Sequence, residues 1–204
     1  RFVSSCDFEL EDGVEVILFG EITLYEPYGR YQLSVKVAQE AGKGNLHIRY
    51  EQLKKKLNAE GLFDPDQKKA IPQIPQNIAL ITSPTGAAAQ DFIRILKRRN
   101  FASKIDLLPV KVQGKQAKDE IVQAIEYISE NQERYDLVVL TRGGGSIEDL
   151  WNFNEESVAR ALFKCPVPSI SAIGHQIDTV LTDLVADHRA ETPSGAAEYI
   201  SSNY

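Results

Sequence analysis

The chain has 204 residues, of which 43% are hydrophobic and 25% are charged, and its formal net charge is −6. This composition predicts a soluble globular protein with one large core and a smaller second one. No apolar run is long enough to span a bilayer, and the first ten residues lack a signal-peptide pattern, so we expect a cytoplasmic protein with no membrane partner. The two cysteines, Cys6 and Cys165, are far apart, which argues against a disulfide framework or a thiolate zinc site.

Charge is unevenly distributed along the chain. Residues 92–118 contain eight Lys or Arg and one acid, whereas residues 145–191 contain eight acids and three Lys or Arg. A basic region next to an acidic one suits a site that binds an anionic chain and also carries carboxylates. A solvated helix face without any partner is the alternative explanation.

Residues 1–50 are expected to form a partial OB-like nucleic-acid-binding domain. Apolar residues alternate in two runs, 14–18 and 31–37, with turns at 27–29 and 41–44. This pattern predicts three or four strands up to about residue 50. An OB-fold has five, so its first strands would lie before Arg1. Four aromatic side chains are candidates for stacking on bases, with hairpin or core packing as the alternative: Phe19, Tyr25, Tyr28 and Tyr31.

A helix at 51–60, ended by Gly61, and a proline-containing linker together cover residues 51–76. From residue 77 to 204 strands and helices alternate. The predicted strands are 78–81, 105–112, 137–140 and 167–173, and the predicted helices are 85–99, 118–129, 154–163 with Asn154 as N-cap, 179–187 and one from about Pro193. The fold class is therefore α/β, an open, mostly parallel sheet flanked by helices, preceded by a partial OB-type β domain.

Small and polar residues follow the predicted strands at 82–86, 113–114, 141–146 and 171–175. Ligands of open α/β sheets bind beyond the carboxyl ends of the strands, so these segments should converge on one site. Two of the segments are suited to phosphate. Ser83, Thr85 and Gly86 lie at a helix start, where free N–H groups attract anions. The other segment combines the bidentate donor Arg142 with Gly143, Gly144, Gly145 and Ser146, whose backbone N–H groups can form an anion nest.

Proton transfer is predicted for His175, which follows a glycine at a strand end. Asp178, three residues later, can set the tautomer of the imidazole and raise its pKa. Asp183 and Asp187 share a helix face and could either bind a metal or cap and solvate that helix. We assign no residue to a metal and expect no cofactor to be required.

Several motifs together resemble the large subunit of bacterial exodeoxyribonuclease VII. They are ITLYEPYGRYQL, YEQLKKKLNAEGLFD, ITSPTGAA, LKRR, VQG, RGGGSIEDLWNFNEESVARA, ISAIGH and LVADHRAETPSGAAE, and they extend over about residues 13–198. The resemblance implies hydrolysis of single-stranded DNA from either end to oligonucleotides with 5′-phosphates. It also implies a small subunit bound through a C-terminal helical region absent from this chain, and independence of metal ions.

By motif, the resemblance implies catalytic roles for Asp91, Arg142, His175 and Asp178. The chain departs from the family at Gln176, where Glu is usual, so that position receives no catalytic role. Two other functions are open. One is a non-catalytic single-strand DNA-binding scaffold subunit. The other is acyl hydrolysis with Ser146 as nucleophile, although Ser146 is not in a G-x-S-x-G elbow.

Overall fold

The computed structural model describes residues 16–25, 29–40, 43–173 and 179–202. Contacts divide the chain into two compact units, residues 1–51 and residues 52–204. No helix within the described ranges combines the length and the apolar character needed to cross a membrane.

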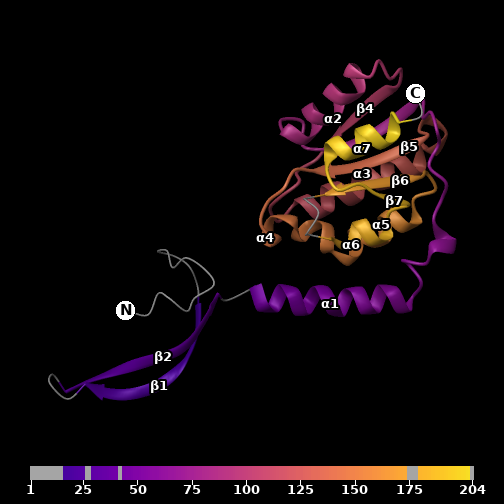
Figure 1. The fold of residues 1–204 in the computed structure, drawn as a ribbon. Coiled ribbons are helices and arrows are strands. Elements are labelled where there is room, and N and C mark those ends of the chain that lie inside the picture. The colour runs from indigo at the N-terminus through magenta and orange to yellow at the C-terminus, as the bar shows by residue number, and fades with distance from the viewer. Residues whose placement is uncertain (1–15, 26–28, 41–42, 174–178, 203–204) are drawn as a thin grey trace. The chain divides into compact units, whose positions relative to one another are not determined.

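The first unit contains an antiparallel hairpin of β1 (Val16–Tyr25) and β2 (Arg30–Glu40) (Figure 1). The register shifts between Phe19 and Gly20, and a Cβ on Gly20 would lie 2.2 Å from the Ser34 carbonyl oxygen. Only glycine therefore allows the two backbones to approach at this bulge. Phe19 and Tyr31 are 69% and 82% exposed in this hairpin.

Helix α1 (Lys43–Ala59) follows the hairpin. The prediction of further strands up to residue 50 was wrong, as was that of a turn extending to Gly44, because residues 43–50 are the first two turns of this helix. The segment from residue 51 is rich in Lys, Leu, Glu and Gln, which favour helix. That helix continues eight residues toward the N-terminus beyond its predicted start.

The second unit is built on a five-stranded parallel sheet in the order β4-β3-β5-β6-β7. Its strands are β3 (Asn77–Thr82), β4 (Lys104–Pro109), β5 (Leu137–Arg142), β6 (Ser169–Ile173) and β7 (His188–Arg189). The predicted parallel α/β fold is confirmed. The edge strand β7 was not predicted; it follows α6 (Leu181–Val185), which is shorter than the predicted helix at 179–187.

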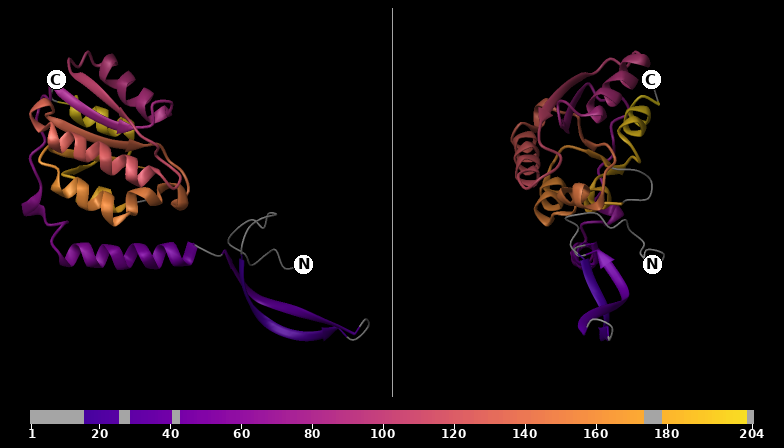
Figure 2. Two further views of the ribbon diagram at one scale, coloured as in Figure 1. Left: turned by 180° about the vertical axis from the view of Figure 1, so that it is seen from behind. Right: turned by 90° about the vertical axis from the view of Figure 1, so that its left-hand side faces the viewer.

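Helices cover both faces of this sheet. Helices α2 (Ala87–Arg98) and α7 (Pro193–Ile200) contact each other on one face, and α3 (Ala117–Glu130) and α5 (Glu156–Lys164) contact each other on the other (Figure 2). Alternate strand residues such as Leu80 and Val139 pack with α2 and α7 in one fully buried cluster. Shorter helical segments are η3 (Pro65–Gln67), η4 (Gln132–Arg134), α4 (Ile147–Leu150) and η5 (Trp151–Asn154).

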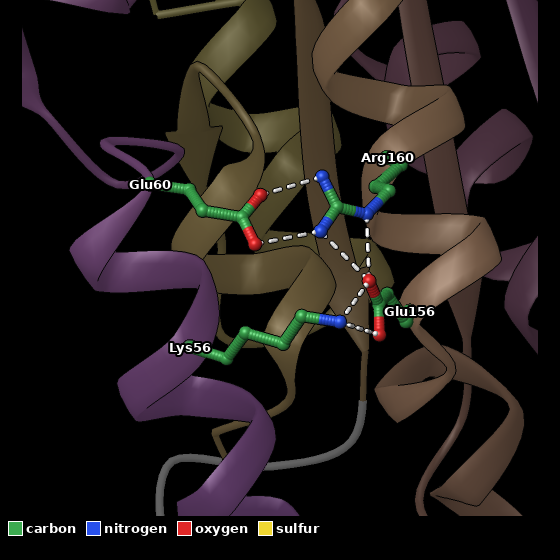
Figure 3. A network of polar contacts seen from close by, with 4 residues as sticks. All are labelled: Lys56, Glu60, Glu156 and Arg160. Carbon is green, nitrogen blue, oxygen red and sulfur yellow. Dashed lines mark hydrogen bonds and ion pairs between the residues drawn. The ribbon is translucent and has the colours of Figure 1, made fainter.

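The end of α1 is part of the second unit. Leu57 is fully buried, and an ionic network beside it joins α1 to α5 (Figure 3). Lys56 Nζ lies 2.8 and 2.9 Å from the two carboxylate oxygens of Glu156, and Arg160 bonds both Glu156 and Glu60. The hydrogen bond from Lys56, together with that from Arg160, holds the pKa of the Glu156 carboxyl below its usual value.

Asn154 has a different role from the predicted one. Helix α5 begins at Glu156 with Glu155 as its N-cap, so Asn154 does not cap it. Asn154 is 3% exposed, and its Oδ1 accepts a hydrogen bond of 2.8 Å from the backbone N–H of Leu181. It therefore satisfies a free N–H group at the start of α6, a helix 27 residues further along the chain.

Candidate functional site

Parallel pairing places the carboxyl ends of three neighbouring strands at one sheet edge. Strands β3, β5 and β6 are adjacent and end at Thr82, Arg142 and Ile173, with Arg142 level with Ile173 in the register. The loops that follow β3 and β5 thus start side by side. The predicted proton-transfer pair, His175 and Asp178, follows β6 but lies outside the described residues.

Arg142 is the last residue of β5, and its side chain is only 8% exposed. Its Nη2 donates a hydrogen bond of 3.2 Å to Gln113 Oε1, from the segment that follows β4. The same Nη2 lies 3.6 Å from Asp149 Oδ2 on α4. Nη1 is shielded from solvent, and it has no hydrogen-bond partner among the residues that the structure describes. A buried cation with an unused donor is costly unless a ligand supplies the acceptor.

The glycine loop lies against this guanidinium. A Cβ on Gly145 would lie 2.8 Å from both Nη1 and Nη2 of Arg142, so a side chain at this position would displace the arginine. A Cβ on Gly143 would meet no atom within 4 Å, which leaves open space at that backbone. Gly144 lies between them in an exposed segment. The loop therefore brings backbone close to Arg142 at one glycine and leaves room for a ligand at another.

Ser146 is the N-cap of α4. Its Oγ accepts a hydrogen bond of 3.4 Å from the backbone N–H of Asp149. This contact starts the short helix that carries the Asp149 carboxylate to Arg142. The hydroxyl thus has a local structural role, while His175, the base of the acyl-hydrolysis alternative, lies outside the described residues.

The loop after β3 leads into α2. Ser83 Oγ and Thr85 Oγ1 are 3.4 Å apart, and the Gly86 N–H donates to the Ser83 carbonyl at 3.2 Å. Gly86 is the N-cap of α2 and supplies no side-chain acceptor. The first-turn N–H groups of α2 and both hydroxyls are thus available near the same edge.

Asp91 lies one turn into α2. Its Oδ1 accepts a hydrogen bond of 2.5 Å from Arg94 Nη2, and the structure gives it no contact with Arg142. Beside this pair, a cleft of about 370 Å³ starts at Pro84 and follows α2 toward β4. Ile93 and Leu107 contribute apolar surface to the cleft, and Arg94 and Lys97 contribute positive charge.

Asp183 and Asp187 bond structural elements rather than each other. Asp183 accepts hydrogen bonds from Ser171 Oγ at 2.5 Å and from the Val180 N–H at 3.2 Å. Burial raises the pKa of its carboxyl to about 6. Asp187 accepts bonds of 2.7 Å from the N–H groups of Ser169 and Lys69, so it ties β6 to the residues before β3. No group of three or more His, Cys, Asp or Glu side chains within the described part of the chain could hold a metal ion.

The two residues that contact Arg142 are not among the site residues predicted from the sequence. Gln113 lies in one of the predicted strand-end segments, and Asp149 lies in the EDLW run directly after RGGGS. The position of Gln113 offered a signal, because its segment is expected at the same edge, whereas Asp149 lies beyond the predicted segment 141–146. Which of their neighbours they bond is decided by the packing of β4, β5 and α4.

Comparisons with known proteins agree with the motifs. The family model "Exonuclease VII, large subunit" matches residues 62–204. Two relatives are named "Exodeoxyribonuclease 7 large subunit". The one from Halothermothrix orenii is 49% identical over 96% of this chain and 48% of its own length. The one from Bacillus subtilis is 52% identical over 94% of this chain and 42% of its own length. The relative in Halalkalibacterium halodurans is 50% identical over 94% of this chain and 42% of its own length.

The chain thus spans about half the length of the curated relatives it matches. Among solved structures, a GDP-L-fucose synthetase from Naegleria fowleri aligns with a TM-score of 0.31 and 16% identity, over 67% of this chain and 44% of that one. Such a likeness is too weak to support an inference. The family model and the close relatives, in contrast, cover most of this sequence, and the chain belongs to the exonuclease VII large-subunit family.

Proposed function

We propose that the whole protein hydrolyses phosphodiester bonds of single-stranded DNA from either end, giving oligonucleotides with 5′-phosphates. The observation that carries this proposal is the buried Arg142 with an unpartnered Nη1 beside a glycine loop. The planar guanidinium of arginine can donate two parallel hydrogen bonds to two oxygens of one phosphate, a geometry that suits phosphate better than most other anions. The relatives named exodeoxyribonuclease 7 large subunit support a nuclease that acts on DNA.

In the proposed mechanism, Arg142 and the N–H groups of residues 143–145 stabilise the negative charge that develops on the phosphate. His175 moves the proton, oriented by Asp178. Asp91, fixed by Arg94, orients a donor or the attacking water. We further propose that no divalent metal is required, because Arg142 and the backbone donors can supply the positive charge that metal ions supply in other nucleases.

The substrate strand is proposed to approach along the cleft beside α2. The cleft begins at Pro84, next to the hydroxyls of the loop after β3, and combines apolar surface with two cations. A single strand presents both phosphates and base faces, whereas a duplex hides the base faces in its stack. Apolar and cationic groups side by side therefore favour a single strand.

Partners and location are proposed from the same family. The whole protein is expected to bind the exonuclease VII small subunit through a helical region on the C-terminal side of Tyr204, and to act in the cytoplasm. The hairpin of the first unit is proposed as part of an OB-type domain that binds DNA. Its exposed aromatic residues Phe19 and Tyr31 support this role.

The test is a cleavage assay with the full-length protein and its small subunit on labelled single-stranded and double-stranded DNA. Arg142→Ala should lower the cleavage rate by roughly 10²–10³, the usual cost of removing one charge-stabilising donor. Arg142→Lys should recover little, because an ammonium cannot replace the planar fork. Lys164→Ala, which removes an exposed cation at the end of α5, is the matched control and should cleave normally.

Near-normal cleavage by Arg142→Ala would refute the proposed role of the arginine. A wild-type complex that binds single strands without cleaving them would refute the nuclease proposal and indicate a scaffold. The assay is repeated in excess chelator. Loss of cleavage that magnesium restores would contradict the metal-independent mechanism alone.

A further inference from the structure

We propose that Gln113 and Asp149 are positioning residues for Arg142, and that Asp149 is a resident counter-anion which a substrate phosphate displaces. This inference rests on the proposed function, because it concerns how the arginine of that site meets phosphate. Neither residue belongs to the set of catalytic and binding candidates drawn from the motifs.

Gln113 fixes the orientation of the guanidinium. Its Oε1 accepts a hydrogen bond from Nη2 at 3.2 Å, and Gly145 packs so closely on the group that a Cβ would lie 2.8 Å from both Nη atoms. Because the acceptor is on Nη2, the unpartnered donor is Nη1. A neutral amide accepts this bond without neutralising the cation, so the positive charge stays available to a phosphate.

Asp149 supplies a weaker and displaceable contact. Its Oδ2 lies 3.6 Å from Nη2, which is an ion pair but too long for a good hydrogen bond. The Asp149 side chain is 45% exposed, whereas that of Arg142 is 8% exposed. The carboxylate can therefore turn toward water when another anion arrives, while the arginine stays in place.

One continuous segment of backbone carries Arg142, the glycine loop and Asp149. Arg142 ends β5, the glycine loop follows, and the Ser146 cap starts α4, which returns Asp149 to the same guanidinium seven residues later. In the absence of a ligand, Asp149 partly neutralises a buried cation. A phosphate can form charge-assisted hydrogen bonds shorter than the 3.6 Å contact of Asp149 and thus competes successfully.

The main experiment measures steady-state kinetics of the full-length protein with its small subunit on single-stranded DNA. Asp149→Asn should lower KM several-fold, because the substrate phosphate no longer competes with a carboxylate. Glu148→Gln removes the same charge from the neighbouring exposed position on α4 and should leave KM near the wild-type value. A role for Asp149 in folding alone would never lower KM.

Gln113 is tested by the split between kcat and KM. Gln113→Ala should lower kcat about tenfold with a small change in KM, because the guanidinium loses its fixed orientation and about 1.4 kcal/mol of transition-state stabilisation. Gln113→Glu should raise KM, since a second carboxylate would compete with the phosphate. Gln113→Asn, which keeps the amide but shortens the side chain, should fall between wild type and alanine.

A second readout does not depend on cleavage. Inorganic phosphate binding, measured by calorimetry, should be tighter for Asp149→Asn than for wild type and unchanged for Glu148→Gln. If Asp149→Asn binds phosphate no better and leaves KM unchanged, the counter-anion role is refuted. If the variants bind phosphate as expected but even the wild type cleaves no DNA, the proposed function fails while the positioning of Arg142 stands.

Discussion

The hairpin of the first unit and the parallel sheet of the second contain the same kinds of apolar residue in opposite environments. Ile22 and Leu24 of β1 are 77% and 54% exposed, whereas Leu80 of β3 and Val139 of β5 are fully buried. Helices cover both faces of the parallel sheet, but a two-stranded ribbon cannot bury its own faces. A β-forming pattern therefore predicts strands but does not predict where the stability of the molecule lies.

We propose different tasks for the two regions. In the second unit a closed core holds Arg142 with one donor unpartnered, as a site for chemistry requires. In the first unit aromatic and aliphatic side chains of the hairpin are exposed, and we propose that the aromatic ones contact DNA. We expect substitutions in the second unit to alter stability and rate, and substitutions in the hairpin to alter binding.

The largest expected effect on stability is at Leu57, at the end of α1. Leu57→Ala should lower the free energy of unfolding by about 2–5 kcal/mol, because it opens a cavity at a fully buried position. Ile22→Ala, at a position 77% exposed, should change it by less than about 0.5 kcal/mol. Trp151, the one tryptophan of this sequence, lies in the second unit, so its fluorescence in urea follows that unit directly. Equal effects of the two substitutions would contradict the conclusion that buried residues of the second unit contribute more to stability than exposed residues of the hairpin.

The next effect is a pH dependence at Asp183. Burial raises the pKa of its carboxyl from 3.8 to about 6, which favours the neutral form in the folded state. Its contribution to stability is therefore fully present below about pH 4 and is lost as the pH rises through 6, by roughly 3 kcal/mol in all.

The free energy of unfolding is measured between pH 4 and 7 for wild type and for Asp183→Asn. The difference between the two pH profiles gives the contribution of the Asp183 carboxyl. The asparagine variant should lack the decline with rising pH. Asp91→Asn, which removes a partly exposed carboxylate, should keep it. A wild-type slope in the Asp183 variant would show that another group causes the pH dependence.

The smallest expected effect is on DNA binding by the hairpin. Tyr31→Ala should weaken binding of single-stranded DNA roughly tenfold, the typical loss when one stacking aromatic is removed. Cleavage at saturating DNA should stay near the wild-type rate, because the proposed catalytic residues belong to the other unit. Tyr127→Ala, at a half-exposed tyrosine of α3, is the control and should bind normally in a fluorescence-anisotropy titration. If Tyr31→Ala changed kcat and left binding intact, the division of tasks would be wrong.

Much of the fold followed from local patterns. Apolar runs of strand length alternating with amphipathic helices predicted the parallel sheet, and the boundaries of β3 and β5 agree with the structure to within two residues. The failures are at positions where neighbours in space decide. Residues 43–50 joined a helix instead of forming strands, and Asn154 accepts a hydrogen bond from Leu181 at the start of α6 instead of capping α5.

The sequence by itself determined the α/β class, the position of Arg142 and the glycines at a strand end, and the motifs of the family. These properties depend on side-chain periodicity and on the order of residues along the chain, which are local. Only the tertiary structure decided that Arg142 is buried and that Gln113 and Asp149 contact it. The burial of a side chain and its hydrogen-bond partners depend on segments far apart in sequence that the sheet brings to one edge.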